Sequence, residues 1–161
     1  QPTLRVPDIG LGVATSCSLG PICLLRERRI ERGDDFRIEQ LAGLANKEGR
    51  TSDATAMLRE ALVLNRDVGY REGIAEVLVT MASTLQSVNA RAGALTLLAA
   101  AARLREEIGG GAGWVGDAIE RLRGSLRDSL GGAAFEAAWK EGSLLSTDEA
   151  IALALEETRE V

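Results

Sequence analysis

The sequence predicts an all-α fold in which antiparallel helix pairs stack into an array closed by a C-terminal helical cap. A pattern of small and apolar residues recurs forty residues further along the chain. Within each copy these residues are spaced three or four apart, as on one face of a helix. Aromatic residues make up only 3% of the chain, so a core of Leu, Ala, Val and Ile is expected, which suits closely packed helices. No stretch of useful length alternates apolar and polar residues as a strand would.

The repeat is clearest at its alanines and at its turns. The small residues stand at matching positions: Ala42, Ala54 and Ala61 in the first copy, Ala82, Ala94 and Ala101 in the second. Gly49 in a turn of the first copy is matched by Asn89 in the second. A period of this length, made of two helices and a short turn, is typical of helical repeat arrays. One such unit cannot bury its apolar face alone, so units stack and leave a groove rather than a reaction centre.

Residues 1–34 are predicted to be irregular apart from one short helix over 22–32, because Pro and Gly punctuate them. Cys17 and Cys23 fit neither a disulfide framework nor a four-ligand zinc site, so we expect two reduced thiols, with a redox pair as the alternative. The uncharged stretch 9–25 is too interrupted by Gly and Pro to span a membrane and lacks the order of a signal peptide. A cytoplasmic protein is expected.

Four helices are expected over residues 35–109, forming two repeats, at 35–48, 51–69, 74–86 and 90–108. Thr51 or Ser52 would cap the second helix, and Asp53 would lie in its first turn, where the helix dipole favours negative charge. The first helix should turn its apolar residues inward: Phe36, Ile38, Leu41, Leu44 and Ala45. The second should do the same with its own set: Ala54, Met57, Leu58, Ala61, Leu62 and Leu64.

A glycine-rich linker is predicted over 110–116, followed by a helical cap over 117–161. The cap should contain helices over 117–130 and 133–141, the latter stopped by Gly142, and a third that starts at Ser146. Glu149 stands three residues after Ser146 and completes a capping box. Phe135 and Trp139 lie on one helix face, which favours a role in packing over a role in anchoring a binding partner. Trp114, in the linker, either plugs the end of the groove or is exposed.

The composition argues against several functions. Histidine is absent, so no Ser-His or Cys-His pair can form and no imidazole can act as a base or metal ligand. The net charge of −5 gives no field that would attract nucleic acid. The glycine-rich stretch 109–116 lacks the Lys of a Walker-type phosphate loop, which favours a linker over a phosphate cradle. We therefore expect that the chain is not an enzyme and that it binds no metal and no cofactor.

The repeat positions resemble the tetratricopeptide family, which places small residues where these alanines stand and large apolar residues where Ile38, Leu41 and Leu58 stand. The period of forty exceeds that of most tetratricopeptide repeats, and the additional residues lie around 69–75. The longer connection between the repeats, together with the C-terminal segments, resembles the repeat arms of large bacterial signal-transduction ATPases. These include LuxR-type and MalT-like regulators and ATPase–cyclase proteins. The resemblance covers residues 40–157. The N-terminal Gln1 is consistent with a fragment of a longer chain.

The resemblance implies which residues meet a partner, because the first helix of each tetratricopeptide pair lines the concave face. It places there Glu39, Gly43, Asn46 and Lys47 from the first copy and Val79, Ser83, Gln86 and Ser87 from the second. Ordinary solvent-exposed positions remain the alternative. This mixed polar face would favour a peptide or protein over nucleic acid or a membrane. The implied function is a non-catalytic interaction or sensor arm of a bacterial signalling or transcriptional regulator, or alternatively a free-standing repeat adaptor. A homodimer through an open end of the stack is also expected.

Overall fold

The computed structural model describes residues 34–110 and 113–161, with side chains from Gln40 onward. All regular secondary structure in these ranges is helical, which confirms the all-α prediction. The predicted helix over 22–32, Cys17 and Cys23 lie outside the described residues, as do the side chains of Phe36, Ile38 and Glu39.

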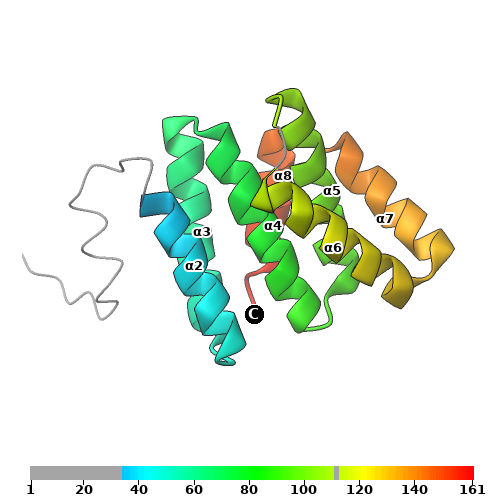
Figure 1. Ribbon diagram of the computed structural model, residues 1–161, viewed down its shortest axis with the longest axis horizontal. Helices are drawn as coiled ribbons and strands as arrows, with labels where there is room; N and C mark the ends of the chain where they lie inside the picture. Colours follow the sequence, from blue (N-terminus) through cyan, green and yellow to red (C-terminus); the bar gives the residue numbers. More distant parts are fainter. Residues whose placement is uncertain (1–33, 111–112) are drawn as a thin grey trace, which may run out of the picture. The chain divides into compact units, whose positions relative to one another are not determined.

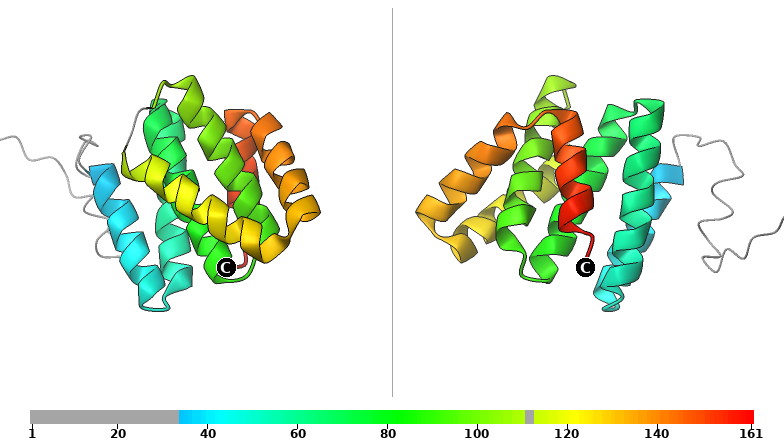
Figure 2. Two further views of the ribbon diagram at one scale, coloured as in Figure 1. Left: turned by 45° about the vertical axis from the view of Figure 1, so that its right-hand side comes forward. Right: turned by 180° about the vertical axis from the view of Figure 1, so that it is seen from behind.

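Seven helices follow one another in the described part of the chain (Figure 1). They are α2 (Asp34–Lys47), α3 (Thr51–Val68), α4 (Arg71–Ser87), α5 (Arg91–Glu107), α6 (Trp114–Leu130), α7 (Gly132–Leu144) and α8 (Thr147–Glu157). Helices α2 to α5 pack side by side in antiparallel succession, and α6 crosses obliquely over α4 and α5. Helix α7 packs along α5, and α8 returns to the opposite side of α4 and α5 (Figure 2).

Helices α2 to α5 all end in the same turn. In each turn one residue adopts a left-handed conformation, namely Gly49, Gly69, Asn89 and Gly109, with φ of 76°, 71°, 65° and 71°. The first turn shows the pattern: the Gly49 N–H donates to the Asn46 carbonyl, and the Arg50 N–H donates to the Ala45 carbonyl. This is the Schellman arrangement, in which glycine is favoured and asparagine is tolerated. The matching of Gly49 with Asn89, read from the repeat, is therefore a matching of backbone conformation.

Helix α5 forms the centre of the described unit. Every residue from Ala94 to Ala101 is buried, because α5 contacts α4, α6, α7 and α8 around its circumference. A helix that is apolar on all sides is stable only in such a position. Its alanines let α7 approach so closely that a Cβ built on Gly142 would lie 2.0 Å from the Thr96 carbonyl oxygen. Gly142 was expected to stop a helix, and this prediction is wrong: α7 continues to Leu144, and Gly142 lies within α7 against the backbone of α5.

Three further local predictions need correction. Neither Thr51 nor Ser52 caps α3, whose cap residue is Arg50 without a side-chain cap bond; the Arg50 guanidinium instead pairs with Glu48 and Asp53. Helix α4 begins at Arg71 and not at residue 74. Helix α6 begins at Trp114, so residues 114–116 belong to a helix and not to the linker.

The capping box at the start of α8 is confirmed. The Glu149 N–H donates to the Ser146 hydroxyl oxygen at 3.3 Å, and the Ser146 N–H donates to a Glu149 carboxylate oxygen at 2.7 Å. The other end of α8 is held to α3, because the Arg59 guanidinium donates to the Leu155 carbonyl and to the Thr158 hydroxyl. None of the described helices is long and apolar enough to cross a membrane.

This capping box makes the stability of α8 depend on pH. The Ser146 hydroxyl, and then its backbone N–H, stabilise the ionised carboxylate and lower the pKa of Glu149 from its ordinary 4.5. A group whose folded-state pKa is depressed stabilises the fold above its unfolded-state value, and this contribution is lost as the pH falls through the lower folded value. We expect Glu149→Gln to be less stable than the native chain at pH 7, with the difference shrinking as the pH falls below 4.5 and through the lowered folded-state pKa of Glu149. Urea unfolding at pH 7 and at a series of acidic pH values measures this, and a pH-independent difference would contradict it.

Candidate partner-binding groove

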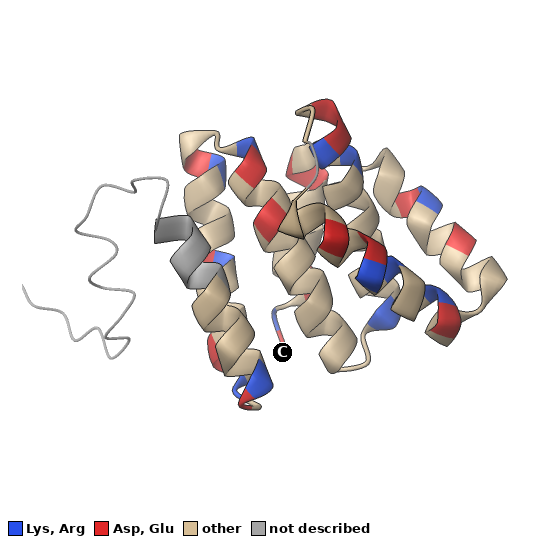
Figure 3. Cartoon of the chain, viewed as in Figure 1, with Lys and Arg blue, Asp and Glu red and all other residues tan. Residues whose placement is uncertain are grey.

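The first helices of three successive helix pairs, α2, α4 and α6, line a groove of about 1080 Å³. Each contributes a stripe of residues three or four apart, so that each stripe is one face of its helix. The stripes are Gln40, Leu41, Gly43, Leu44 and Lys47 on α2, Val79, Thr80, Ser83 and Gln86 on α4, and Trp114, Ala118, Arg121, Leu122 and Ser125 on α6. In Figure 3 the visible length of α4 is largely uncharged, with its acidic residues near its N-terminal end.

Two leucines of α2 are exposed on this groove. Leu41 is 41% exposed and Leu44 is 51% exposed, although both were expected to point inward. The reason for this error is that α2 packs through its small residues, with Ala42 and Ala45 fully buried. The leucines beside them belong to the same helix but face the groove. Exposed large apolar residues at one concavity are a feature of binding surfaces.

The structure brings together most of the residues predicted for the concave face. Lys47, Val79, Ser83 and Gln86 line the one groove, as does Gly43. Val79 is only 2% exposed, so it forms part of the floor rather than a free contact. Glu39 lies on α2 in the segment whose side chains are outside the described residues.

Asn46 and Ser87 are not among the residues that line the groove. The Asn46 amide donates to the Thr84 hydroxyl at 2.6 Å and joins α2 to α4, and the Ser87 hydroxyl donates to the Thr84 carbonyl. Asn46 therefore holds the first helices of two neighbouring pairs in register. In this structure it supports the groove wall instead of presenting a polar group to a partner.

We expect Asn46→Ala to lower the free energy of unfolding by about 1 kcal/mol, because it removes a half-buried hydrogen bond between α2 and α4. The matched control is Lys47→Ala in the same helical turn, where an exposed side chain without an ion pair in the described residues should change stability by less than about 0.5 kcal/mol. Urea unfolding of both variants makes the comparison. Equal effects would mean that the bond to Thr84 does not contribute.

The wall formed by α6 was not predicted. Ala118, Arg121 and Leu122 face the groove from the first helix of the predicted cap, and Trp114, which was predicted to lie in the linker, precedes them on the same helix. The Gln86 amide donates to the Ser125 hydroxyl at 2.7 Å, which ties this wall to α4. The repeat offsets give no counterpart for α6, and its apolar residues at three- and four-residue spacing were the only signal in the sequence.

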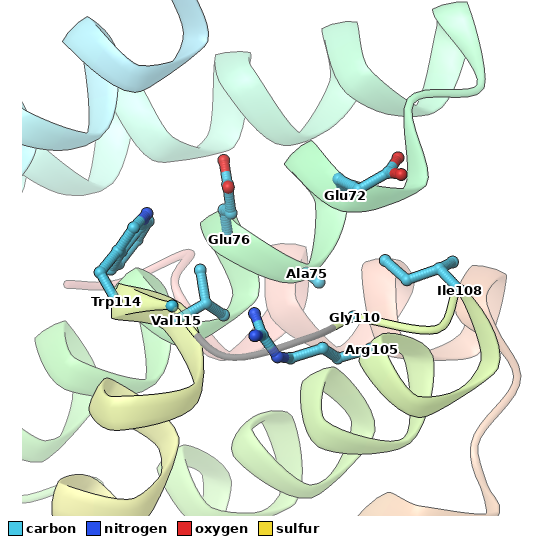
Figure 4. Close-up of a pocket in the computed structure, with 9 residues that line it drawn as sticks. Glu72, Ala75, Glu76, Arg105, Ile108, Gly110, Trp114 and Val115 are labelled. Atoms are coloured by element: carbon cyan, nitrogen blue, oxygen red, sulfur yellow. The ribbon is translucent and has the colours of Figure 1, made fainter.

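Trp114 stands at one end of the groove and is 43% exposed. Both alternatives for this residue therefore hold in part, since it bounds the groove and also meets solvent. On its other side Trp114 borders a smaller pocket of about 210 Å³ (Figure 4). Glu72 and Glu76 of α4 and Arg105 of α5 also line that pocket, so the charges near Trp114 lie beyond the groove and not within it.

The aromatic stripe on α7 is structural, as the sequence favoured. Phe135 is 1% exposed and its ring stacks on Trp139 with centroids 6.0 Å apart. The Arg127 guanidinium lies 4.7 Å from the centre of the Phe135 ring, and that of Arg123 lies 4.4 Å from the Trp139 ring. These contacts fasten α7 to α6, so the stripe supports the helix that forms the third wall of the groove.

The chain is similar in sequence to bacterial proteins that are named as putative transcriptional regulators. It is 31% identical over 114 residues to proteins named "Putative HTH-type transcriptional regulator", Rv0890c of Mycobacterium tuberculosis (strain H37Rv) and Mb0914c of Mycobacterium bovis. The match covers 70% of this chain and 13% of each regulator, so the chain spans a small part of the length of these relatives. No family model matches the chain. No solved structure matches it either.

Proposed function

We propose that this chain is a non-catalytic protein-interaction arm of a bacterial transcriptional regulator and that it binds a peptide or protein segment in the groove between α2, α4 and α6. The observation that carries the proposal is the alignment of three helix faces on one groove, with Leu41, Leu44 and Trp114 exposed along it. Apolar surface gathered in a concavity is costly to leave in water and is covered on binding.

The similarity to transcriptional regulators supports the place of this arm within a larger system. The matched segment is 13% of a much longer regulator, as expected for one arm among several parts. Such an arm would act by binding, so that a partner seated in the groove alters the state of the rest of the regulator. The absence of histidine from the chain supports a non-catalytic role.

The proposal is tested with two variants that introduce the same charge, one inside the groove and one outside it. Leu44→Glu places a carboxylate in the groove, whereas Leu144→Glu places one on α7, where Leu144 is 74% exposed and outside the groove. Each variant is expressed with an affinity tag in the source cell, treated with a crosslinker and purified, and helix content is checked by circular dichroism.

We expect the Leu44→Glu variant to lose crosslinked proteins that the Leu144→Glu variant and the native chain retain. Both leucines are exposed, so both substitutions should leave the helix content unchanged. Identical crosslinking of the two folded variants would show that the groove is not the binding surface.

A further inference from the structure

The charges of the groove indicate the chemistry of what binds there. Lys47 at the end of α2 and Arg121 on α6 both line it, and none of the described residues that line it is Asp or Glu. The described side chains that line the groove therefore carry a net positive charge, although the chain as a whole carries a net charge of −5. A local field of this kind selects the charge of an incoming segment.

These two cations also differ from most others in the described residues. Seven arginines form ion pairs with carboxylates: Arg50, Arg66, Arg71, Arg103, Arg123, Arg127 and Arg159. Within the described part of the chain neither Lys47 nor Arg121 forms an ion pair, and the Arg121 guanidinium donates to the Asp117 carbonyl at 3.3 Å. No described carboxylate neutralises either charge.

The polar groups of the groove indicate the backbone conformation of its occupant. An extended peptide brings unpaired N–H and C=O groups that the groove must satisfy, whereas a helix bonds its own. The Gln86 amide is already bonded to Ser125, and the Thr80 hydroxyl to the Glu76 carbonyl. These side chains are thus already engaged within the chain, which favours a helical occupant, because a helix bonds its own backbone groups.

The apolar residues and the size of the groove agree with a short helix. Leu41 and Leu44 stand on one wall, and Trp114 and Leu122 on the other, where anchors at i, i+3, i+4 and i+7 of an amphipathic helix can contact them. The stripe from Trp114 to Ser125 runs about 16 Å along α6, which is the length of about three helical turns.

We propose that the groove binds an amphipathic helix of a protein partner whose apolar stripe is flanked by carboxylates that pair with Lys47 and Arg121. This inference rests on the proposed function, because it names the partner class of the same groove. Charge-assisted bonds from the two cations would fix the register of the helix, and burial of its apolar stripe would supply most of the affinity.

The test is a selection from displayed peptides against the full chain. One library fixes an apolar stripe at helical spacing and varies the flanking positions among Glu, Lys and Ser; a second library contains Pro throughout and remains extended. We expect enrichment of helical peptides with Glu at the flanks, binding about tenfold more tightly than their Lys counterparts. This preference should shrink as the salt concentration rises.

The variant Lys47→Glu/Arg121→Glu should reverse the preference toward Lys-flanked helices. The matched control is Lys140→Glu/Arg159→Glu, which changes the net charge equally at exposed positions outside the groove and should keep the preference for Glu. A reversal in both double variants would assign the effect to overall charge and overturn the inference.

Other outcomes separate this inference from the proposed function. Enrichment of Lys-flanked or uncharged helices, or of extended peptides only, would overturn the acidic helix while leaving the groove as a binding site. No enrichment from either library would also overturn it, and the crosslinking comparison of Leu44→Glu with Leu144→Glu then decides the proposed function separately.

Discussion

Gly142→Ala is expected to lower the free energy of unfolding by about 3 kcal/mol or more, at the upper end of the effects of overpacking. The new Cβ would lie 2.0 Å from the Thr96 carbonyl oxygen and 2.8 Å from the Ala99 Cβ. The first contact is with the backbone of the central helix, which cannot rotate aside as a side chain would. Helix α7 must therefore move away from α5, and the packing around Phe135 is weakened with it.

The matched control is Gly124→Ala on α6, where a Cβ meets nothing within 4 Å. That substitution should stabilise the chain by about 0.5–1 kcal/mol, because alanine loses less conformational entropy in a helix than glycine. Thermal and urea unfolding of the two variants measures the contrast. A stabilising effect at both positions would mean that α7 does not lie as close to α5 as the structure shows.

Phe135→Ala is expected to cost about 3–5 kcal/mol, the range for truncating a buried aromatic side chain. Phe135 is 1% exposed, stacks on Trp139 and lies against the Arg127 guanidinium. Its removal leaves a cavity and frees the contacts that hold α7 to α6. The more conservative Phe135→Leu should cost less, about 1.5 kcal/mol. Urea unfolding checks both values, and a loss below about 1 kcal/mol for Phe135→Ala would contradict the packing described.

Local signals with a single physical cause could be predicted from the sequence. The matching of Gly49 with Asn89 succeeded because both residue types adopt the left-handed conformation that a Schellman turn requires. The capping box at Ser146 and Glu149 succeeded because its hydrogen bonds join residues only three apart. The alanines of the repeat are buried because their size is what allows the helices to approach.

Predictions of whether an apolar helix face is buried in the core or exposed on the surface were less successful. Leu41 and Leu44 have the spacing of core residues, but apolar spacing alone does not distinguish a core face from a groove face. Gly142 was assigned to a helix end because glycine commonly stands there, whereas here it allows contact with a helix more than forty residues earlier in the chain. Such non-local contacts leave no local signal.

The groove could be predicted in part. Lys47, Ser83 and Gln86 were placed on it by repeat position, and they line it. Asn46 has the same kind of position, yet its side chain is directed to Thr84 on the neighbouring helix. Trp114 was placed at the end of the groove as one of two alternatives. The rest of the third wall, from Ala118 to Ser125, was missed because α6 does not follow the period of forty residues.

The most direct test of the groove as a binding surface is site-specific photocrosslinking in the source cell. A photoreactive amino acid replaces Ser83, which is exposed in the groove, and in a second variant Ala152, which is exposed on α8. We predict protein adducts from position 83 and none from position 152. Adducts from position 152 alone, or equal adducts from both positions, would contradict the assignment of the groove between α2, α4 and α6 as the partner-binding surface.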